Sequence, residues 1–250
     1  MMIITFAYAF VSVLMVSMIS LIGILVLSLR EIFLRKYIFI FISLAVGALL
    51  GDAFVHLIPE ALESSFHPAF VSVLIIIGIL IFFILEKFLH WHHHGQDLHE
   101  AHINPVGPLV LFSDTVHNLI DGIVIGVSFM VSIPLGIATT VAVMFHESPQ
   151  EIGDFTVLLH SGYSKKRALW LNFLSALSAL VGVIIAFMLG ESSAGFTLFI
   201  LPIAAGGFIY IAVADLIPEL HKTKEITYSL FQIIAVALGV LAMVALIFIE

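Results

Sequence analysis

The chain has 250 residues, of which 62% are hydrophobic and 10% are charged, and its mean hydropathy is +1.22. Soluble domains are about half apolar and about a quarter charged, so this composition excludes an ordinary soluble fold and indicates a helical membrane protein. The absence of cysteine excludes disulfides and thiolate metal sites. The formal net charge of −8 does not indicate a nucleic-acid partner, and we expect none, because many of the acidic residues lie inside apolar stretches.

Apolar runs separated by polar or proline-containing breaks predict an all-α integral membrane protein with eight transmembrane helices. One span needs about 20 apolar residues, so the chain length is used up by about eight spans and short loops. The first run lacks the basic segment and the cleavage site of a signal peptide, and we expect it to be a retained span. The predicted spans are 3–29, 37–62, 69–90, 105–131, 134–160, 166–189, 195–220 and 226–249.

The basic residues predict the orientation. With eight spans, all nine lysines and arginines fall on one side of the bilayer. That side is expected to be cytoplasmic, because short cytoplasmic loops are enriched in Lys and Arg, and both termini are then extracytoplasmic. The nine residues are Arg30, Arg35, Lys36, Lys87, Lys165, Lys166, Arg167, Lys222 and Lys224.

The longest connection, at about 90–104, lies on this cytoplasmic side and is rich in histidine. Two interpretations remain open for it. It is either a polar loop, or a loose metal buffer or sensor, since clustered imidazoles bind Zn²⁺ without fixed geometry. Its histidines are His90, His92, His93, His94, His99 and His102.

An internal repeat relates the second and seventh spans. GALLGDAFVHLIPEAL at 47–62 aligns with GGFIYIAVADLIPELH at 206–221, with an offset of 159 residues. Equivalent positions are separated by an odd number of membrane crossings, so the two copies run in opposite directions. This predicts an inverted repeat of helices 1–3 and 6–8 around helices 4 and 5, a common transporter plan. Glu60 and Glu219 are either relays at the two membrane faces or interfacial carboxylates that face water.

Two adjacent spans, 105–131 and 134–160, carry metal-binding side chains at helical spacing. In the first, the spacing i, i+3, i+4, i+7 puts four polar side chains on one stripe. In the second, one row follows i, i+4, i+8, and another row lies beside it. Imidazole combined with carboxylate favours Zn²⁺, Fe²⁺ or Mn²⁺. The residues are Asp114, His117, Asn118 and Asp121, followed by His146, Glu147, Gln150, Glu151 and Asp154.

Helix packing and catalysis account less well for these side chains than metal transport does. Hydrogen bonding between helices suits single polar residues, but not so many metal-binding ones. An intramembrane metal-dependent hydrolase is the alternative function, yet HESPQ at 146–150 lacks the second histidine of HExxH. Proline inside the spans, at Pro59, Pro149 and Pro218, predicts kinks. Asn172 and Ser175 are interpreted as packing or hydrogen-bonding residues.

These motifs resemble those of the ZIP (Zrt-, Irt-like) family of divalent metal transporters. HNLIDGIVIG matches the fourth-helix signature HNxxDGxxxG, and HESPQEIGDF matches the fifth-helix signature HExPHExGD of one subgroup. GDAFVHLIPEAL and FIYIAVADLIPEL resemble the second and seventh helices of that subgroup. The resemblance covers most of the chain. It implies eight helices in a 3+2+3 arrangement, outward termini, a cytoplasmic histidine-bearing loop after helix three and, often, a homodimer.

The resemblance also implies a binuclear metal site between helices four and five. One position departs from the signature, because Gln150 replaces a histidine, and Glu151 is therefore added as a candidate ligand. The expected function is uptake of Zn²⁺, with Fe²⁺, Mn²⁺ and Cd²⁺ as further candidates, without catalytic residues or a catalytic cofactor. A large extracellular domain of animal members is missing, so a prokaryotic cell membrane is the expected location. The candidate ligands are His117, Asn118, Asp121, His146, Glu147, Gln150 and Glu151.

Overall fold

The computed structural model describes residues 2–22, 31–91, 106–192, 194–222 and 225–249. All regular structure in these ranges is helical, and no strand occurs in them. Most of the predicted histidine-rich loop, at 92–105, lies outside the described residues. The helices of the first half are α1 (Met2–Ile19) with the 3-10 turn η1 (Ser20–Ile22), α3 (Glu31–Gly51), η2 (Asp52–Leu57), α4 (Ile58–Leu62), α5 (Pro68–Trp91) and α6 (Val106–Val131).

The second half is also helical, and it begins with the longest helix of the described chain, α7. The elements are α7 (Ile133–His160), α8 (Lys165–Ala176), α9 (Ser178–Ser192), α10 (Ala194–Tyr210), η3 (Ile211–Leu216), α11 (Ile217–His221), α12 (Ile226–Leu246) and the 3-10 turn η4 (Ile247–Ile249). Ser132 caps α7 by accepting a hydrogen bond from the Leu135 backbone N–H.

Six helical segments of the described chain are long and apolar enough to cross a membrane. The apolar part of α1, Ile3–Ile19, is shorter than these six. α7 is not among them, and its second half carries the polar residues that the sequence singles out. The six segments are Phe39–Leu62, Pro68–Leu85, Val110–Val131, Lys165–Gly190, Gly195–His221 and Tyr228–Leu246.

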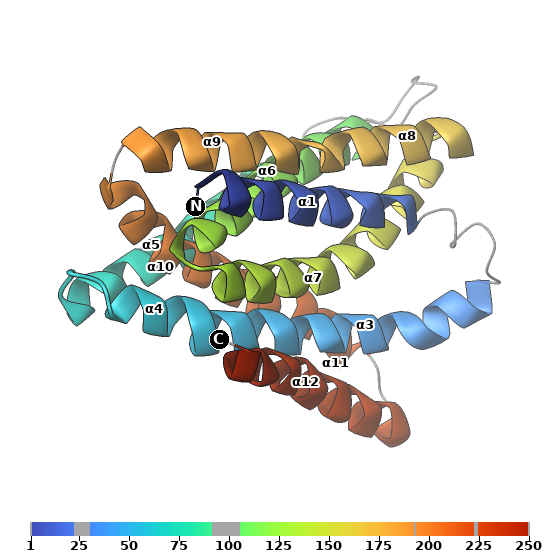
Figure 1. The fold of residues 1–250 in the computed structure, drawn as a ribbon. Helices are drawn as coiled ribbons and strands as arrows, with labels where there is room; N and C mark the ends of the chain where they lie inside the picture. The colour runs from blue at the N-terminus through green and yellow to red at the C-terminus, as the bar shows by residue number, and fades with distance from the viewer. Residues whose placement is uncertain (1, 23–30, 92–105, 193, 223–224, 250) are drawn as a thin grey trace.

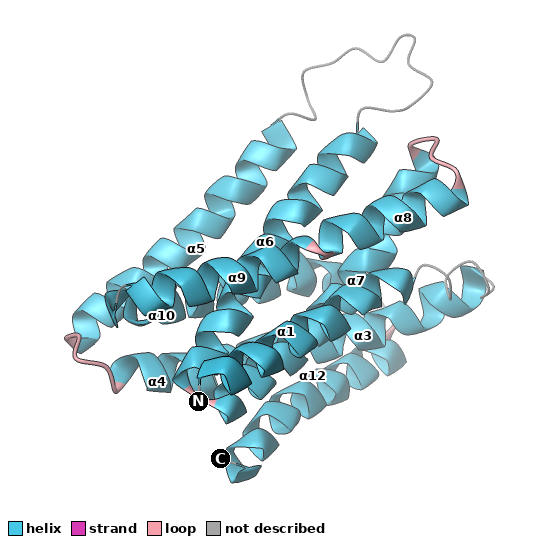
Figure 2. Ribbon diagram, turned by 45° about the horizontal axis from the view of Figure 1, so that its top comes forward, coloured by secondary structure: helices cyan, strands magenta, loops and turns pink. Residues whose placement is uncertain are grey.

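The helices form two groups that contact each other along α3 and α7. α1, α6, α7, α8 and α9 pack mainly on one another, and α3, α5, α10 and α12 form the other group. Both labelled chain ends lie at one end of the bundle, and the turn between α7 and α8 lies at the opposite end (Figures 1 and 2). Within the first group, α6 and α7 pack on each other, and their polar residues face each other there. α7 also contacts α3 of the second group.

Glycine allows α6 to approach α9 closely. A Cβ added at Gly122 would lie 2.0 Å from the Ala179 carbonyl oxygen, and one at Gly182 would lie 2.2 Å from the Leu119 carbonyl oxygen. Only helices without side chains at the crossing can come this near. Because Gly122 follows Asp121 directly, this contact fixes the position of one predicted metal ligand.

Two π-helical turns interrupt the second and seventh predicted spans. η2 directly precedes the helical turn that contains Pro59, and η3 directly precedes the turn that contains Pro218. Proline lacks an N–H and its ring crowds the carbonyl one turn earlier, so a wider turn accommodates it. The sequence predicts kinks at these prolines, and the described helices contain π-helical turns there.

Candidate metal centre

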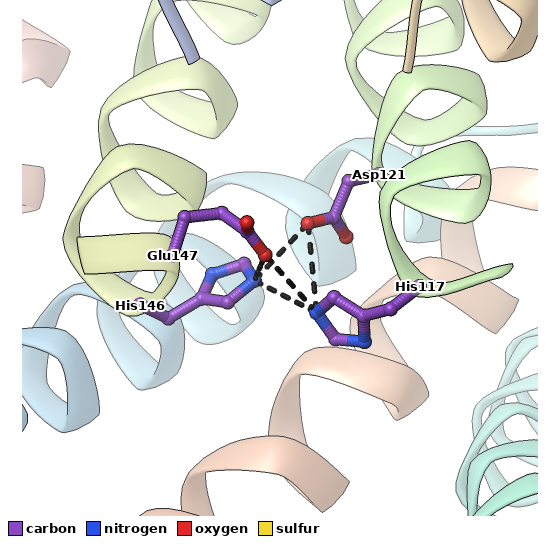
Figure 3. A group of neighbouring side chains, drawn as sticks. All are labelled: His117, Asp121, His146 and Glu147. Atoms are coloured by element: carbon purple, nitrogen blue, oxygen red, sulfur yellow. Dashed lines mark hydrogen bonds and ion pairs between the residues drawn. The ribbon is translucent and has the colours of Figure 1, made fainter. Parts of the chain in front are cut away.

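Four side chains from α6 and α7 converge in the interior of the bundle. His117 and Asp121 are one turn apart on α6, whereas His146 and Glu147 are consecutive on α7 (Figure 3). Consecutive side chains of an α-helix point about 100° apart. α6 packs against the part of the α7 surface between His146 and Glu147, so both side chains reach the same site. Their ligand atoms all lie within 4.8 Å of one another.

The distances within this group match those between the ligands of a tetrahedral zinc ion. Ligands about 2.0–2.1 Å from a tetrahedral metal are about 3.3–3.4 Å from one another. The two His Nε2 atoms are 3.2 Å apart, and His146 Nε2 lies 3.1 Å from Asp121 Oδ2 and 3.5 Å from Glu147 Oε1. His117 Nε2 lies 3.7 Å and 3.4 Å from the same two oxygens.

The surroundings of His146 suit metal binding. Its Nδ1 lies 3.3 Å from the Ala142 carbonyl oxygen, which can only accept a hydrogen bond. With an ion on Nε2, the Nδ1–H would donate to this carbonyl and orient the ring. The side chains of Asp121, His146 and Glu147 are at most 1% exposed, whereas that of His117 is 17% exposed. His117 is thus the most accessible member of the group.

A second group of carboxylates shares Glu147. Ligand oxygens of Asp114, Glu147 and Glu151 lie within 4.8 Å of one another, and all three residues are buried. No lysine or arginine of the described chain pairs with these carboxylates. Buried carboxylates without counter-charges are costly, so a cation or protons must compensate them.

Two residues of α8 hold this second group in place. Asn172 donates from Nδ2 to Glu151 Oε2, and Ser175 donates from Oγ to Asp114 Oδ2. The sequence predicts both as packing or hydrogen-bonding residues, and they do form hydrogen bonds, but their partners are candidate site residues. Their helical spacing of three was the available signal, although only the packing of α8 against α6 and α7 identifies these partners.

Asn118 and Gln150 lie beside the four-residue group rather than in it. Asn118 donates from Nδ2 to the Asp114 backbone oxygen (3.1 Å) and to Asp114 Oδ1 (2.8 Å). Its own Oδ1 is buried without a hydrogen-bond partner in the described part of the chain. Gln150 lines a cavity next to His117. The other predicted ligands are therefore distributed over two groups and one cavity wall, whereas Asn118 contacts the second group through Asp114.

The cavity leads from His117 to the end of the bundle opposite the chain ends. Its volume is about 650 Å³, and α5, α6, α7 and the η3–α11 segment contribute most of its wall. The polar side chains that line it include Asp114, His117, Gln150, Asp154, Asp215 and Glu219. Glu219 is exposed and forms an ion pair with Lys222. Acidic side chains thus continue from the four-residue group to this end of the protein.

The polar residues of the first repeat copy are mostly buried. Asp52 and His56 are 0% and 4% exposed, and His56 Nε2 lies 3.0 Å from the Met243 carbonyl oxygen of α12. Glu60 is half-buried and belongs to α4, which lies toward the end of the bundle that holds the chain ends (Figure 1).

Apolar helices around a buried imidazole–carboxylate group define the chain as a multi-pass membrane protein with a group of side chains that could hold a metal ion. The model of the family described as ZIP Zinc transporter matches residues 3–107 and 92–247. The chain belongs to this family, which confirms the resemblance to the ZIP family.

Several curated zinc transporters are similar to the chain. It is 31% identical to zinc transporter zipt-7.1 of Caenorhabditis briggsae, over 80% of this chain and 69% of the relative. It is 33% identical to zinc transporter ZIP13 of Pongo abelii, over 81% and 65%. It is also 33% identical to zinc transporter ZIP4 of Mus musculus, over 74% of this chain but only 38% of the relative.

Proposed function

We propose that the protein carries Zn²⁺ through the membrane by way of His117, Asp121, His146 and Glu147. The observation that carries this proposal is the convergence of two imidazole nitrogens and two carboxylate oxygens at tetrahedral spacing. Zn²⁺ prefers this mixture of ligands and this geometry. Fe²⁺, Mn²⁺ and Cd²⁺ remain candidate substrates, because nitrogen and oxygen ligands also accept them.

Asp114, Glu147 and Glu151 are the candidate ligands for a second ion of a binuclear centre. Glu147 belongs to both groups, so it is suited to bridge two ions. The second group offers oxygen ligands alone among these three residues, and such ligands bind harder cations better than imidazole does. The amide oxygens of Asn118 and Gln150 complete the proposed ligand set.

The proposed direction of transport is into the cytoplasm. The cavity below His117 ends near Glu219 and Leu85, next to the basic residues Lys222 and Lys87. Positive charge marks the cytoplasmic side, so this conformation corresponds to an inward-open state. Alternating access requires a second conformation in which the same ligands are reached from the other side.

The proposed architecture is one transmembrane domain, 1–250, with eight helices in a 3+2+3 arrangement. The repeat of 159 residues and the opposite courses of α3–α4 and α10–α11 in Figure 1 support an inverted repeat of helices 1–3 and 6–8. We assign the protein to the prokaryotic cell membrane with both termini outside. A homodimer and a cytoplasmic histidine-rich loop, at about 90–104, complete the proposal.

Metal flux tests the function directly. In proteoliposomes that contain a zinc indicator, the purified protein is expected to produce saturable Zn²⁺ uptake well above that of empty liposomes. Added Fe²⁺, Mn²⁺ and Cd²⁺ then rank the substrates by competition. Absence of flux from correctly folded protein, together with metal-dependent hydrolysis of a membrane peptide, would favour the hydrolase alternative instead.

The orientation is testable in intact cells. A label at Glu250 is expected to be reachable by an impermeant reagent from outside, because an even number of crossings puts both termini on one side. A label at Lys166 is expected to react only after permeabilisation, since it lies in the basic connection between α7 and α8. The reverse pattern would show that the cavity opens to the outside.

A further inference from the structure

The first turn of α8 carries three basic residues without acidic partners. Lys165, Lys166 and Arg167 begin this helix and are all exposed, and a segment apolar enough to cross a membrane begins at the same residue. None of the three forms an ion pair within the described residues, whereas Lys222 pairs with Glu219. Three uncompensated positive charges therefore lie at the start of a membrane-spanning segment.

The Arg167 guanidinium is held by an aromatic ring. Its Cζ lies 5.2 Å from the centroid of the Tyr163 ring, which is within the range of a cation–π interaction. Tyr163 in turn packs on the beginning of α6, because a Cβ added at Gly107 would lie 2.7 Å from Tyr163 Cε2. The Ser164 side chain caps α8 by accepting a hydrogen bond from the Arg167 backbone N–H. A cation held in this way loses less side-chain entropy when it binds a ligand.

Apolar side chains continue the line of these charges along α8. Trp170 is one turn beyond Lys166 and Arg167, and Leu174 is one further turn along the same face. They are 60% and 51% exposed, and the Trp170 ring packs on Phe173 with 6.0 Å between the ring centroids. We call Lys166, Arg167, Trp170 and Leu174 the outer stripe of α8. Exposed apolar side chains continue on α9 at Val181, Ile184 and Met188.

The outer stripe follows the polarity of a phospholipid in one leaflet. Basic side chains attract phosphate, tryptophan favours the interfacial level, and aliphatic side chains contact acyl chains. Lys166 precedes Leu174 by eight residues, which corresponds to about 12 Å along a helix. This distance fits within one leaflet, since the hydrocarbon core of both leaflets together is about 30 Å thick.

The opposite face of α8 carries the residues that hold the second carboxylate group. Asn172 and Ser175 are buried, and they donate hydrogen bonds to Glu151 and Asp114. α8 contacts both α6 and α7, which provide these carboxylates. The depth of α8 in the membrane therefore sets the position of both donors.

We propose that the outer stripe of α8 binds an anionic phospholipid. Lys166 and Arg167 donate to the oxygens of its phosphate, Trp170 lies at the level of its ester groups, and one acyl chain runs along Leu174. The enrichment of Lys and Arg on the cytoplasmic side accounts for the basic residues, but not for an exposed Trp170 and Leu174 in line with them. A zwitterionic phospholipid carries an ammonium group that offsets its phosphate charge, so it fits unpaired cations less well. The bound lipid fixes the depth of α8 and, with it, the donors to the second carboxylate group.

Fluorescence quenching measures this contact without any transport. The chain has two tryptophans, so Trp91→Phe leaves Trp170 as the single fluorophore. Phospholipids with brominated acyl chains quench a tryptophan that they contact. Because one basic residue near an anionic surface contributes about fivefold in affinity, brominated phosphatidylglycerol is expected to quench Trp170 at an about fivefold lower mole fraction than brominated phosphatidylcholine. Equal quenching by the two lipids would overturn the proposal.

Charge variants distinguish the outer stripe from a general attraction by positive charge. Lys166→Gln and Arg167→Gln should each lower the preference for phosphatidylglycerol and should abolish it together, whereas Lys166→Arg should retain it. Lys222→Gln is the matched control, because it also removes an exposed lysine, but one that is paired with Glu219. An equal loss of preference in Lys222→Gln would contradict a site on α8.

The link to the second carboxylate group has its own readout, and this part rests on the proposed transport function. Zn²⁺ uptake should be several-fold faster in phosphatidylcholine vesicles that contain phosphatidylglycerol than in vesicles without it. The variant with both Lys166→Gln and Arg167→Gln should show no such difference. Lipid-selective quenching combined with lipid-independent uptake would contradict the link, whereas absence of uptake in both kinds of vesicle would count against the transport function and not against the lipid site.

Native mass spectrometry of the unaltered protein covers the case in which a variant does not fold. Phosphatidylglycerol should remain bound after removal of detergent more often than phosphatidylcholine does. An excess of glycerol 3-phosphate should not displace it, because this soluble anion has no acyl chain to contact Leu174. Displacement would indicate a site for soluble phosphate compounds, and either this result or equal retention of the two lipids would overturn the proposal.

Discussion

Replacement of His117 or Asp121 by alanine is expected to lower Zn²⁺ uptake by more than about 100-fold. Loss of an outer partner of a metal ligand costs about 10–100-fold in affinity or activity, and these two residues are proposed as ligands themselves. Asp121 Oδ2 and Glu147 Oε1 each lie within 3.7 Å of both imidazole Nε2 atoms. Because Glu147 is itself a proposed ligand, it cannot also take the place of Asp121. Initial rates in proteoliposomes, normalised to reconstituted protein, measure the effect.

The control for this experiment lies on the same helix. Phe112 is 63% exposed on α6 and does not line the cavity, so Phe112→Ala should transport Zn²⁺ at a nearly wild-type rate. Size-exclusion profiles and thermal unfolding in detergent should be similar for all three variants. Uptake at the wild-type rate by folded His117→Ala or Asp121→Ala would exclude the four-residue group as the transport site.

Gln150→His is expected to tighten Zn²⁺ binding and to change the metal preference. Gln150 lines the cavity together with His117, and imidazole is a much better zinc ligand than a neutral amide. A lower KM for Zn²⁺, by about tenfold, would correspond to about 1.4 kcal/mol of added binding free energy. The maximal rate should be equal or lower, because an ion that binds more tightly also leaves more slowly.

Competitive uptake of Zn²⁺ and Mn²⁺ gives the decisive readout for Gln150→His. Mn²⁺ favours oxygen ligands, so the variant should discriminate against it more strongly than the wild type does. Gln150→Asn keeps the amide and serves as the control for a change in side-chain size. If the preference of Gln150→His is unchanged, Gln150 does not contact the transported ion, and Glu151 becomes the better candidate.

The second carboxylate group provides a reason why Gln150 is tolerated at this position. Glu151 is buried, is oriented by Asn172, and forms a group of candidate ligands with Asp114 and Glu147. The carboxylates of this group would compensate the charge of a second ion bound there. Such an ion would not need a histidine ligand at position 150. The oxygen-rich group is therefore expected to be less selective for zinc than the histidine-containing one.

The sequence by itself determined the helical membrane class, the repeat and the family. Length and composition were sufficient for the class, because only helices and closed barrels satisfy the backbone in a bilayer. Helical periodicity also determined that His117 and Asp121 share one face of α6, since residues one turn apart are neighbours on any α-helix. These features depend on local geometry and on the solvent, and no knowledge of packing is needed to derive them.

Only the tertiary structure decided which side chains of different helices meet. Periodicity places His146, Gln150 and Asp154 on one stripe of α7. The four-residue group nevertheless contains His146 and Glu147, because α6 packs against the surface of α7 between these two side chains. The contact of Gly122 with the Ala179 carbonyl oxygen, the hydrogen bonds from Asn172 and Ser175, and the π-helical turns likewise depend on contacts between helices. The rotation and the depth of one helix against another minimise the packing energy of the whole bundle, and the spacing within a single helix does not contain this information.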